Sequence, residues 1–191
     1  ELANRIEADK NEILRLYTLG EHFDDARKLK EQLDAAAHEE QIRVVFIGQY
    51  TAGKSTIISA LTANKEIIID SDIATSETAD YSWNGVTLTD TPGLYTENPE
   101  HDARTIEMIK KSDLLVYCIT SDLFNQYTLQ DFERWAFTVG YAGKMFLIVN
   151  KMSKEAGDYH ELVENYSDSI NRALIPHSIG EFPYSFVDAK D

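Results

Sequence analysis

The sequence predicts an α/β fold of three layers, preceded by a helical hairpin. From residue 42 onward, short apolar runs typical of buried strands alternate with longer amphipathic segments typical of helices, which is the pattern of a sheet covered by helices. Residues 1–41 instead place apolar side chains every three or four positions among Glu, Asp and Lys, with a break at Gly20. We therefore expect a helical segment over residues 1–41 and one α/β domain over residues 42–191.

The α/β part is expected to contain six strands and four helices. Asn84 and Gly85 separate the second and third strands, and this dipeptide is the strongest local signal for a β-hairpin. Those two strands should therefore be antiparallel neighbours, which leaves a mostly parallel six-stranded sheet with one antiparallel strand. The predicted strands are residues 42–47, 77–83, 86–90, 114–119, 145–150 and 184–188, and the predicted helices are residues 54–64, 101–111, 128–138 and 156–173.

The side-chain pattern also predicts core positions. The single cysteine, Cys118, lies in an apolar run without a second Cys or a basic neighbour, so we expect a buried thiol and not a reactive or metal-binding one. The last predicted helix repeats apolar residues at helical spacing, which assigns them to the core. These residues are Tyr159, Leu162, Val163, Tyr166 and Ile170.

Charge and hydropathy exclude several classes of partner. The 191 residues carry a formal net charge of −15, and binding to nucleic acid or anionic lipid requires clustered Lys and Arg, so no nucleic-acid partner is expected. No apolar run is long enough to span a bilayer, and the charged start Glu1–Lys10 lacks the apolar core of a signal peptide. We therefore expect a cytoplasmic protein whose membrane contact would need segments outside this chain.

The most informative motif is Gly48–Ser55, which reads GQYTAGKS. It follows an apolar strand and opens a helix, which is the context of a phosphate-binding P-loop. Gly48 and Gly53 allow the backbone to wrap so that successive N–H groups point at one phosphate, at the positive end of the helix. Lys54 supplies a positive charge for the outer phosphates and Ser55 a hydroxyl for Mg²⁺. The motif predicts that a nucleoside triphosphate binds here.

A second motif, Asp90-Thr91-Pro92-Gly93, ends a predicted strand at the sheet edge where open α/β folds bind their ligands. Asp90 is placed to hold Mg²⁺ through water, and the N–H of Gly93 is placed to contact the outermost phosphate. Because it follows a P-loop helix and a hairpin, this motif supports a site for a nucleotide with its metal.

With these motifs, residues 42–191 resemble the P-loop GTPases. Asn150-Lys151 ends a strand where that family reads the base with an NKxD motif, and Asp188-Ala189-Lys190 is placed like its SAK motif. The resemblance implies that Asn150 braces the nucleotide loops and that the Lys151 stem lies along the base. It also implies that the ligand is GTP or GDP with Mg²⁺.

The base-reading motif departs from the family at its last position, where Ser153 stands in place of Asp. A hydroxyl cannot accept from two parallel N–H groups as a carboxylate does, so we expect guanine discrimination to fall by about 1.5–3 kcal/mol. Glu155 and Asp158 are candidate substitutes. The preference for guanine over adenine is therefore left open by the sequence.

The family's first switch supplies a Thr whose hydroxyl binds Mg²⁺ and whose N–H contacts the γ-phosphate. Candidates lie between Ala74 and Thr78. Counting back from the hairpin turn, Thr75 fits the distance to the metal best, Ser76 next and Thr78 third.

Within the superfamily, three features resemble the bacterial dynamin-like proteins: the P-loop wording GQYTAGKST, the apolar Leu94 after DTPG, and a helical segment that leads into the first strand. The wording of residues 81–85 and 150–153 is also similar to the labile-enterotoxin output protein A type. The resemblance implies a neck-like helical bundle for residues 1–41 and self-association across the nucleotide face. It also implies peripheral membrane contact in the full-length protein, through regions outside this chain.

Departures from the dynamin pattern concern catalysis. Tyr50 stands where dynamins carry a Gln that positions the attacking water, and Thr51 matches a Ser that helps to hold a monovalent cation. Leu94 cannot orient water. Because positioning and charge stabilisation carry most of phosphoryl-transfer catalysis, we expect slow hydrolysis by the isolated chain.

These observations predict a GTP-binding, slowly hydrolysing switch domain of a dynamin-like protein. Two alternatives stay open, a nucleotide-gated interaction module with little turnover and a compact regulatory GTPase acting on ribosomes or another assembly. The residues assigned to catalysis are Lys54, Tyr50, Thr51 and Thr75, and those assigned to Mg²⁺ are Ser55, Thr75 and Asp90. The residues assigned to nucleotide binding are Gly48, Tyr50, Thr51, Ala52, Gly53, Lys54, Ser55, Thr56, Gly93, Asn150, Lys151, Ser153, Ala189 and Lys190.

Overall fold

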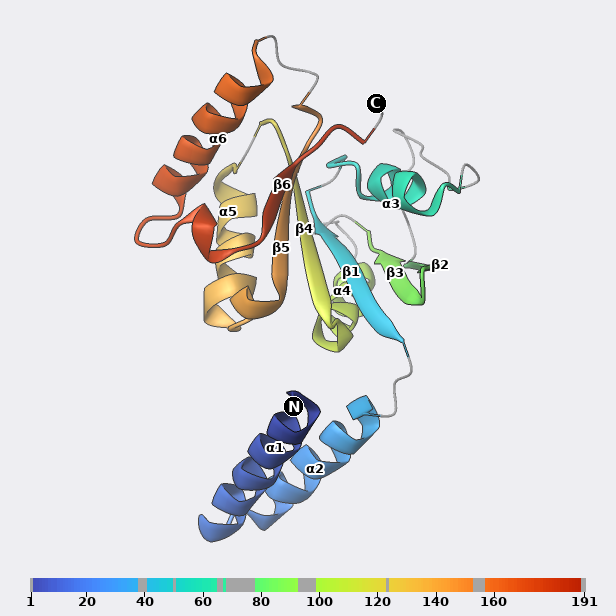
Figure 1. Ribbon diagram of the computed structural model, residues 1–191, viewed down its shortest axis with the longest axis vertical. Helices are drawn as coiled ribbons and strands as arrows, with labels where there is room; N and C mark the ends of the chain where they lie inside the picture. Colours follow the sequence, from blue (N-terminus) through green and yellow to red (C-terminus); the bar gives the residue numbers. More distant parts are fainter. Residues whose placement is uncertain are drawn as a thin grey trace. The chain divides into compact units, whose positions relative to one another are not determined.

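The chain divides into two compact units, Glu1–Gln41 and Ile42–Asp191. The first is a pair of helices, and the second is an α/β unit built on one sheet (Figure 1). The computed structural model describes residues 2–37, 41–49, 51–64, 67, 78–92, 99–122, 124–152 and 157–189.

The helical unit consists of α1 (Leu2–Leu19) and α2 (Phe23–Ala37). The turn between them is a Schellman-type helix end, in which the His22 N–H bonds to the Tyr17 carbonyl and the Glu21 N–H to the Thr18 carbonyl. Glu21 takes the left-handed conformation, with φ 62°. The sequence predicts the helix break at Gly20, and the residue that takes the left-handed conformation at this helix end is the next one, Glu21.

Much of the apolar stripe on the helical unit is accessible to solvent. Ile13, Leu16 and Phe23 are 45%, 55% and 63% exposed. Ala26 and Leu29 on α2 are half-buried. The amphipathic pattern thus forms helices as expected but leaves a large part of its apolar surface uncovered.

The second unit is built on a six-stranded sheet of order β2-β3-β1-β4-β5-β6. β2 pairs antiparallel with β3, and all other neighbours are parallel, as the sequence predicts. The hairpin turn between β2 and β3 has positive φ at both Asn84 (49°) and Gly85 (81°), which is the type I′ geometry that this dipeptide favours. The strands are β1 (Ile42–Gly48), β2 (Ala79–Trp83), β3 (Val86–Asp90), β4 (Leu114–Thr120), β5 (Met145–Asn150) and β6 (Tyr184–Phe186).

Helix boundaries follow their caps. Asn125 accepts hydrogen bonds from the N–H groups of Tyr127 and Thr128, so α5 begins at Gln126, two residues before the expected start. Asp158 caps α6 in the same way, so α6 begins at Tyr159 and not at residue 156. The helices are α3 (Lys54–Thr62), α4 (Pro99–Lys111), α5 (Gln126–Glu133) with its π-helical continuation η1 (Arg134–Thr138), and α6 (Tyr159–Ala173), with short 3₁₀ turns at Ala142–Lys144 and Ile179–Glu181.

Helices cover both faces of the sheet, as a three-layer fold requires. Alternate strand residues point to opposite faces, so Val45 of β1 joins the core beneath α4, α5 and α6, whereas Phe46 joins the smaller core beneath α3. Figure 1 shows α3 on one side of the sheet and α5 and α6 on the other. Among the residues expected in the core from α6, Ile170 is buried, but Tyr159 is 49% exposed, which corrects that assignment.

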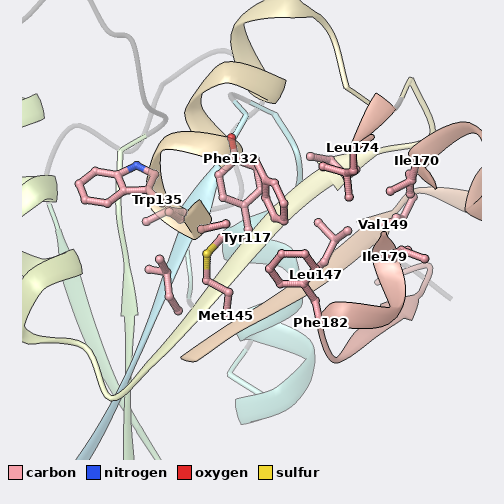
Figure 2. Packing of buried hydrophobic residues seen from close by; sticks show 14 of the residues in the cluster. Tyr117, Phe132, Trp135, Met145, Leu147, Val149, Ile170, Leu174, Ile179 and Phe182 are labelled. Carbon is pink, nitrogen blue, oxygen red and sulfur yellow. The ribbon is translucent and has the colours of Figure 1, made fainter. Parts of the chain in front are cut away.

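The larger core centres on Phe132 of α5, shown with its neighbours in Figure 2. Its ring lies 5.2 Å from that of Tyr117 and 5.0 Å from that of Phe182, both at edge-to-face angles. Such pairs add to the stabilisation that burial alone provides. This core fixes α5 and the segment before β6 against β4.

Replacing Phe132 with Ala should lower the free energy of unfolding by about 3–5 kcal/mol, because the change removes these ring contacts and leaves a cavity. Chemical denaturation followed by circular dichroism measures the change. The control is Tyr127→Ala on the same helix, where the side chain is 70% exposed and the expected effect is below about 0.5 kcal/mol. Equal losses in the two variants would contradict the packing described here.

Candidate functional site

The candidate site lies at the carboxyl edge of the sheet because parallel strands end there together. In the strand register, Gly48 of β1 lies opposite Cys118 of β4, and Asn150 of β5 lies opposite Thr120. Asp90, the last residue of β3, lies opposite Phe46 of β1. This edge is the usual ligand-binding side of an open α/β sheet.

Two glycines allow the P-loop to pass close to neighbouring strands. Gly48 has φ 122°, and a Cβ there would lie 2.2 Å from the Cys118 carbonyl oxygen. Gly53 has φ 87°, and a Cβ there would lie 2.4 Å from Nδ2 of Asn150. Any side chain at either position would clash, so the glycines serve both the tight turn and the close approach. Ala52, between them, is fully buried.

Lys54, the first residue of α3, is folded into the curve of the loop. Its ammonium group donates to the Gln49 carbonyl at 3.1 Å and lies 3.5 Å from the Gly48 carbonyl. The residue is 6% exposed, and burial lowers the pKa of its ammonium group. A negative charge on Cys118 or Asp90 acts in the opposite direction on that pKa. The loop thus holds a cation close to its own N–H groups, where phosphate oxygens would bind.

Ser55 and Asp90 form the second charged feature of the site. The Ser55 hydroxyl donates to Oδ2 of Asp90 at 2.5 Å. Burial raises the pKa of the Asp90 carboxyl group, and the bond from Ser55 and the charge of Lys54 oppose that shift. The other oxygen, Oδ1, is buried without a hydrogen-bond partner among the residues that the structure describes.

An unpaired buried carboxylate oxygen beside a hydroxyl is a donor set suited to Mg²⁺, which prefers oxygen ligands. The residues present therefore fit the metal that the sequence predicts.

Asn150 joins the P-loop to the segment after β6. Its Nδ2 donates to the Ala52 carbonyl at 2.9 Å, and its Oδ1 accepts from the Ala189 N–H at 3.1 Å. The side chain is 2% exposed, so both halves of the amide need these partners. The neighbouring Lys151 donates from Nζ to the Thr51 carbonyl at 2.5 Å. Three loops that the sequence assigned to the nucleotide are thereby brought together.

The remaining assigned residues divide into two groups. Thr56 is half-buried on the first turn of α3, and Thr78, the third candidate for the first switch, is half-buried just before β2. The assigned residues Tyr50, Thr75, Gly93, Ser153 and Lys190, together with Ser76, Leu94 and Glu155, lie outside the described residues.

Asp158, a candidate substitute for the missing base-reading carboxylate, caps α6. Its Oδ1 accepts from the N–H groups of His160 and Glu161 at 2.9 and 3.3 Å. That oxygen is committed to the helix N-terminus, which leaves Asp158 a poor acceptor for a second pair of N–H groups.

Sequence reasoning missed two contributions to the site. Cys118 is buried, as the sequence predicts, and burial raises the pKa of its thiol to about 12. Its carbonyl also accepts from the Gln49 N–H and supports the start of the P-loop. Thr91, within the DTPG motif, donates from its hydroxyl to the Phe46 carbonyl at 2.7 Å and fixes the strand end that carries Asp90. Neither contact has a local sequence signal, because each joins segments far apart in the chain.

A family model described as 50S ribosome-binding GTPase (MMR_HSR1) matches residues 43–151, more than half of the chain. The chain belongs to this GTPase family. Its function therefore includes binding GTP and hydrolysing it. No curated protein sequence matches the chain significantly.

Solved GTPase structures share the fold at low sequence identity. Era from Aquifex aeolicus, bound to GDP·AlF4⁻, has a TM-score of 0.56 and 18% identity over 77% of this chain and 50% of its own. Toc33 from Arabidopsis thaliana has a TM-score of 0.57 and 17% identity over 85% of this chain and 74% of its own. LeoA, a bacterial dynamin GTPase from ETEC, has a TM-score of 0.58 and 18% identity over 98% of this chain and 38% of its own. This chain thus spans half of the Era chain and a smaller share of the LeoA chain, and the likeness concerns the fold.

Replacing Lys54 with Ala should weaken nucleotide binding about 100-fold or more, because the change removes the charged donor from the loop that faces the phosphates. Calorimetry with GDP and GTP measures this, and circular dichroism checks that the variant is folded. Lys110→Ala on α4 changes the same charge at an exposed position and should bind normally. Unchanged nucleotide affinity in folded Lys54→Ala protein would contradict the assignment of the P-loop to the phosphate site.

Proposed function

We propose that this chain is the GTP-binding, slowly hydrolysing switch domain of a dynamin-like protein that acts on membranes through segments outside the chain. The observation that carries the proposal is the extent of the likeness to the LeoA fold, which covers 98% of this chain. Residues 42–191 make up less than 98% of the chain, so the matched region also includes residues of the helical unit. The match to Era, by comparison, covers 77% of the chain.

In this proposal the nucleotide is held by the P-loop, by the motif that begins with Asp90 and by the motif that begins with Asn150. The N–H groups of the P-loop and the ammonium of Lys54 bind the phosphates, while Ser55 and Asp90 hold Mg²⁺. Mg²⁺, when bound, supplies positive charge to the phosphate oxygens. Asn150 holds the P-loop and the segment after β6 at a fixed spacing, so that one nucleotide can bind to both. Thr51, in the left-handed conformation with φ 60°, exposes its side chain on the P-loop and is the candidate for holding a monovalent cation.

Membrane action and location are parts of the same proposal. No helix in the described ranges is long and apolar enough to cross a membrane. The exposed stripe of Ile13, Leu16 and Phe23 supports a neck-like bundle for residues 1–41, because such a surface requires a packing partner. We place the protein in the cytoplasm, with peripheral membrane contact in its full-length form.

A compact regulatory GTPase is the second candidate, and the family description favours it. The matched family is named for 50S ribosome binding, and one Era structure contains 16S ribosomal RNA. The charge of −15 opposes RNA binding, because phosphate backbones are bound by clustered cations. Filter binding with ribosomal RNA at low and moderate salt separates the candidates: salt-sensitive binding would favour the regulatory GTPase.

GTP should bind better than ATP, but by a margin about 1.5–3 kcal/mol smaller than a carboxylate at position 153 would give. Competition titrations with the two nucleotides measure the margin. Ser153→Asp should widen it, because a carboxylate accepts from two guanine N–H groups. Ser178→Asp, which adds the same charge away from the sheet edge, is the control. A clear preference for ATP would contradict the base assignment.

Turnover by the isolated chain should be slow, on the order of 10⁻² s⁻¹ or less, because Tyr50 and Leu94 replace groups that orient water. In the full-length protein, the rate per molecule should rise with protein concentration if self-association across the nucleotide face completes the site. Phosphate release across a concentration series, with Lys54→Ala as the blank, tests both statements. For the similar chloroplast translocon components Toc33 and Toc159, dimerization is important for GTPase activity, which supports this expectation. Fast, concentration-independent hydrolysis would contradict both, and no hydrolysis at any concentration would favour the interaction module.

A further inference from the structure

A hydrogen bond at the end of the last strand lies outside the nucleotide-binding residues named above. The phenol hydroxyl of Tyr159, the first residue of α6, donates to the carbonyl oxygen of Phe186 at 2.9 Å. Tyr159 is 49% exposed, so burial of its ring is only partial. The hydroxyl bond connects this side chain to β6.

The acceptor faces the side of β6 that lies away from β5. β6 is three residues long and lies at the end of the sheet, next to β5. The Leu147 N–H bonds to the Pro183 carbonyl, and the Val187 N–H bonds to the Val149 carbonyl, so residues 183 and 187 face β5. Backbone groups alternate in direction along a strand, and the Phe186 carbonyl therefore points away from β5. Tyr159 holds β6 from the side opposite to its partner strand.

β6 positions the segment that follows it, residues 187–189, which binds to Asn150. Ala189, three residues beyond Phe186, donates its N–H to Oδ1 of Asn150 at 3.1 Å. Between them, the Val187 carbonyl accepts from the Met152 N–H at 3.4 Å, which is a long bond. A three-residue edge strand has few bonds of its own to resist fraying. Its attachment to α6, a 15-residue helix, therefore limits the movement of the segment that follows.

We propose that Tyr159 is a positioning residue for base recognition. Its hydroxyl anchors the end of β6 to α6, which keeps the Ala189 N–H against Asn150 and holds the segment after β6 in place for the guanine base. Tyr159 contacts neither the phosphates nor the metal in this arrangement. The proposal rests on the proposed function, in which a guanine nucleotide binds at this edge of the sheet and Asn150 and Ala189 belong to the residues assigned to it.

The test is Tyr159→Phe, which removes the hydroxyl and keeps the ring. The matched control is Tyr127→Phe on α5, a tyrosine that is 70% exposed and whose hydroxyl has no hydrogen bond in the described part of the chain. Calorimetry or competition titration gives the dissociation constants for GDP and ADP in the presence of Mg²⁺, and steady-state phosphate release gives kcat and KM for GTP.

We expect Tyr159→Phe to weaken GDP binding about three- to tenfold and to raise KM for GTP by a similar factor, as the loss of one hydrogen bond predicts. ADP binding and kcat should change less than about twofold, so the ratio of GDP to ADP affinity falls. Tyr127→Phe should match the wild type in every measurement.

Two results would overturn the proposal. GDP affinity and KM equal to those of Tyr127→Phe would show that the hydroxyl does not act on the base site. Equal losses for GDP and ADP, or a fall in kcat alone, would show a general loosening of the domain. A wild-type chain that binds no guanine nucleotide would instead remove the proposed function on which the inference rests, and the wild-type titration separates that case from the other two.

Discussion

The candidate nucleotide site depends on one buried amide. Asn150 is 2% exposed and bonds at one end to the Ala52 carbonyl and at the other to the Ala189 N–H. A buried amide that lost either partner would cost about 1–3 kcal/mol, so the two loops are held at one spacing. The same amide explains why Gly53 must lack a side chain, because a Cβ would lie 2.4 Å from its nitrogen. The phosphate loop and the segment after β6 are thus parts of one unit.

The charges of the site are set by burial and by each other. Burial lowers the pKa of Lys54 and raises that of Asp90, which moves both groups toward their neutral forms. The attraction between the two opposes both shifts. A phosphate group beside Lys54 and a cation beside Asp90 would each favour the charged form of that side chain. Binding of ligand and metal would therefore offset the free-energy cost of burying these two charges in the folded protein.

Much of this arrangement could be predicted from local patterns. The bounds of β3 and β5 agree with the prediction, because Asn-Gly and polar residues end their apolar runs sharply. Contacts between distant segments could not be predicted in the same way. Tyr159 fits an apolar stripe at helical spacing, which predicts a core position, yet its side chain is 49% exposed and its hydroxyl donates to the Phe186 carbonyl. Asp158 has the charge to read a base, but the start of α6 at the next residue commits it to a cap.

In the proposed function, the departure from the family motif at Ser153 changes what base recognition would depend on. A carboxylate would provide discrimination through its charge and its two acceptors, and would tolerate small shifts of the surrounding loops. In the proposed function, with Asp158 Oδ1 occupied by the helix cap, recognition would depend more on how the segment after β6 is held, and the Ala189 N–H binds that segment to Asn150. Main-chain groups discriminate by position alone, because every residue carries them. If no carboxylate reads the base, selectivity for guanine would therefore depend more strongly on the hydrogen bonds that hold the end of β6.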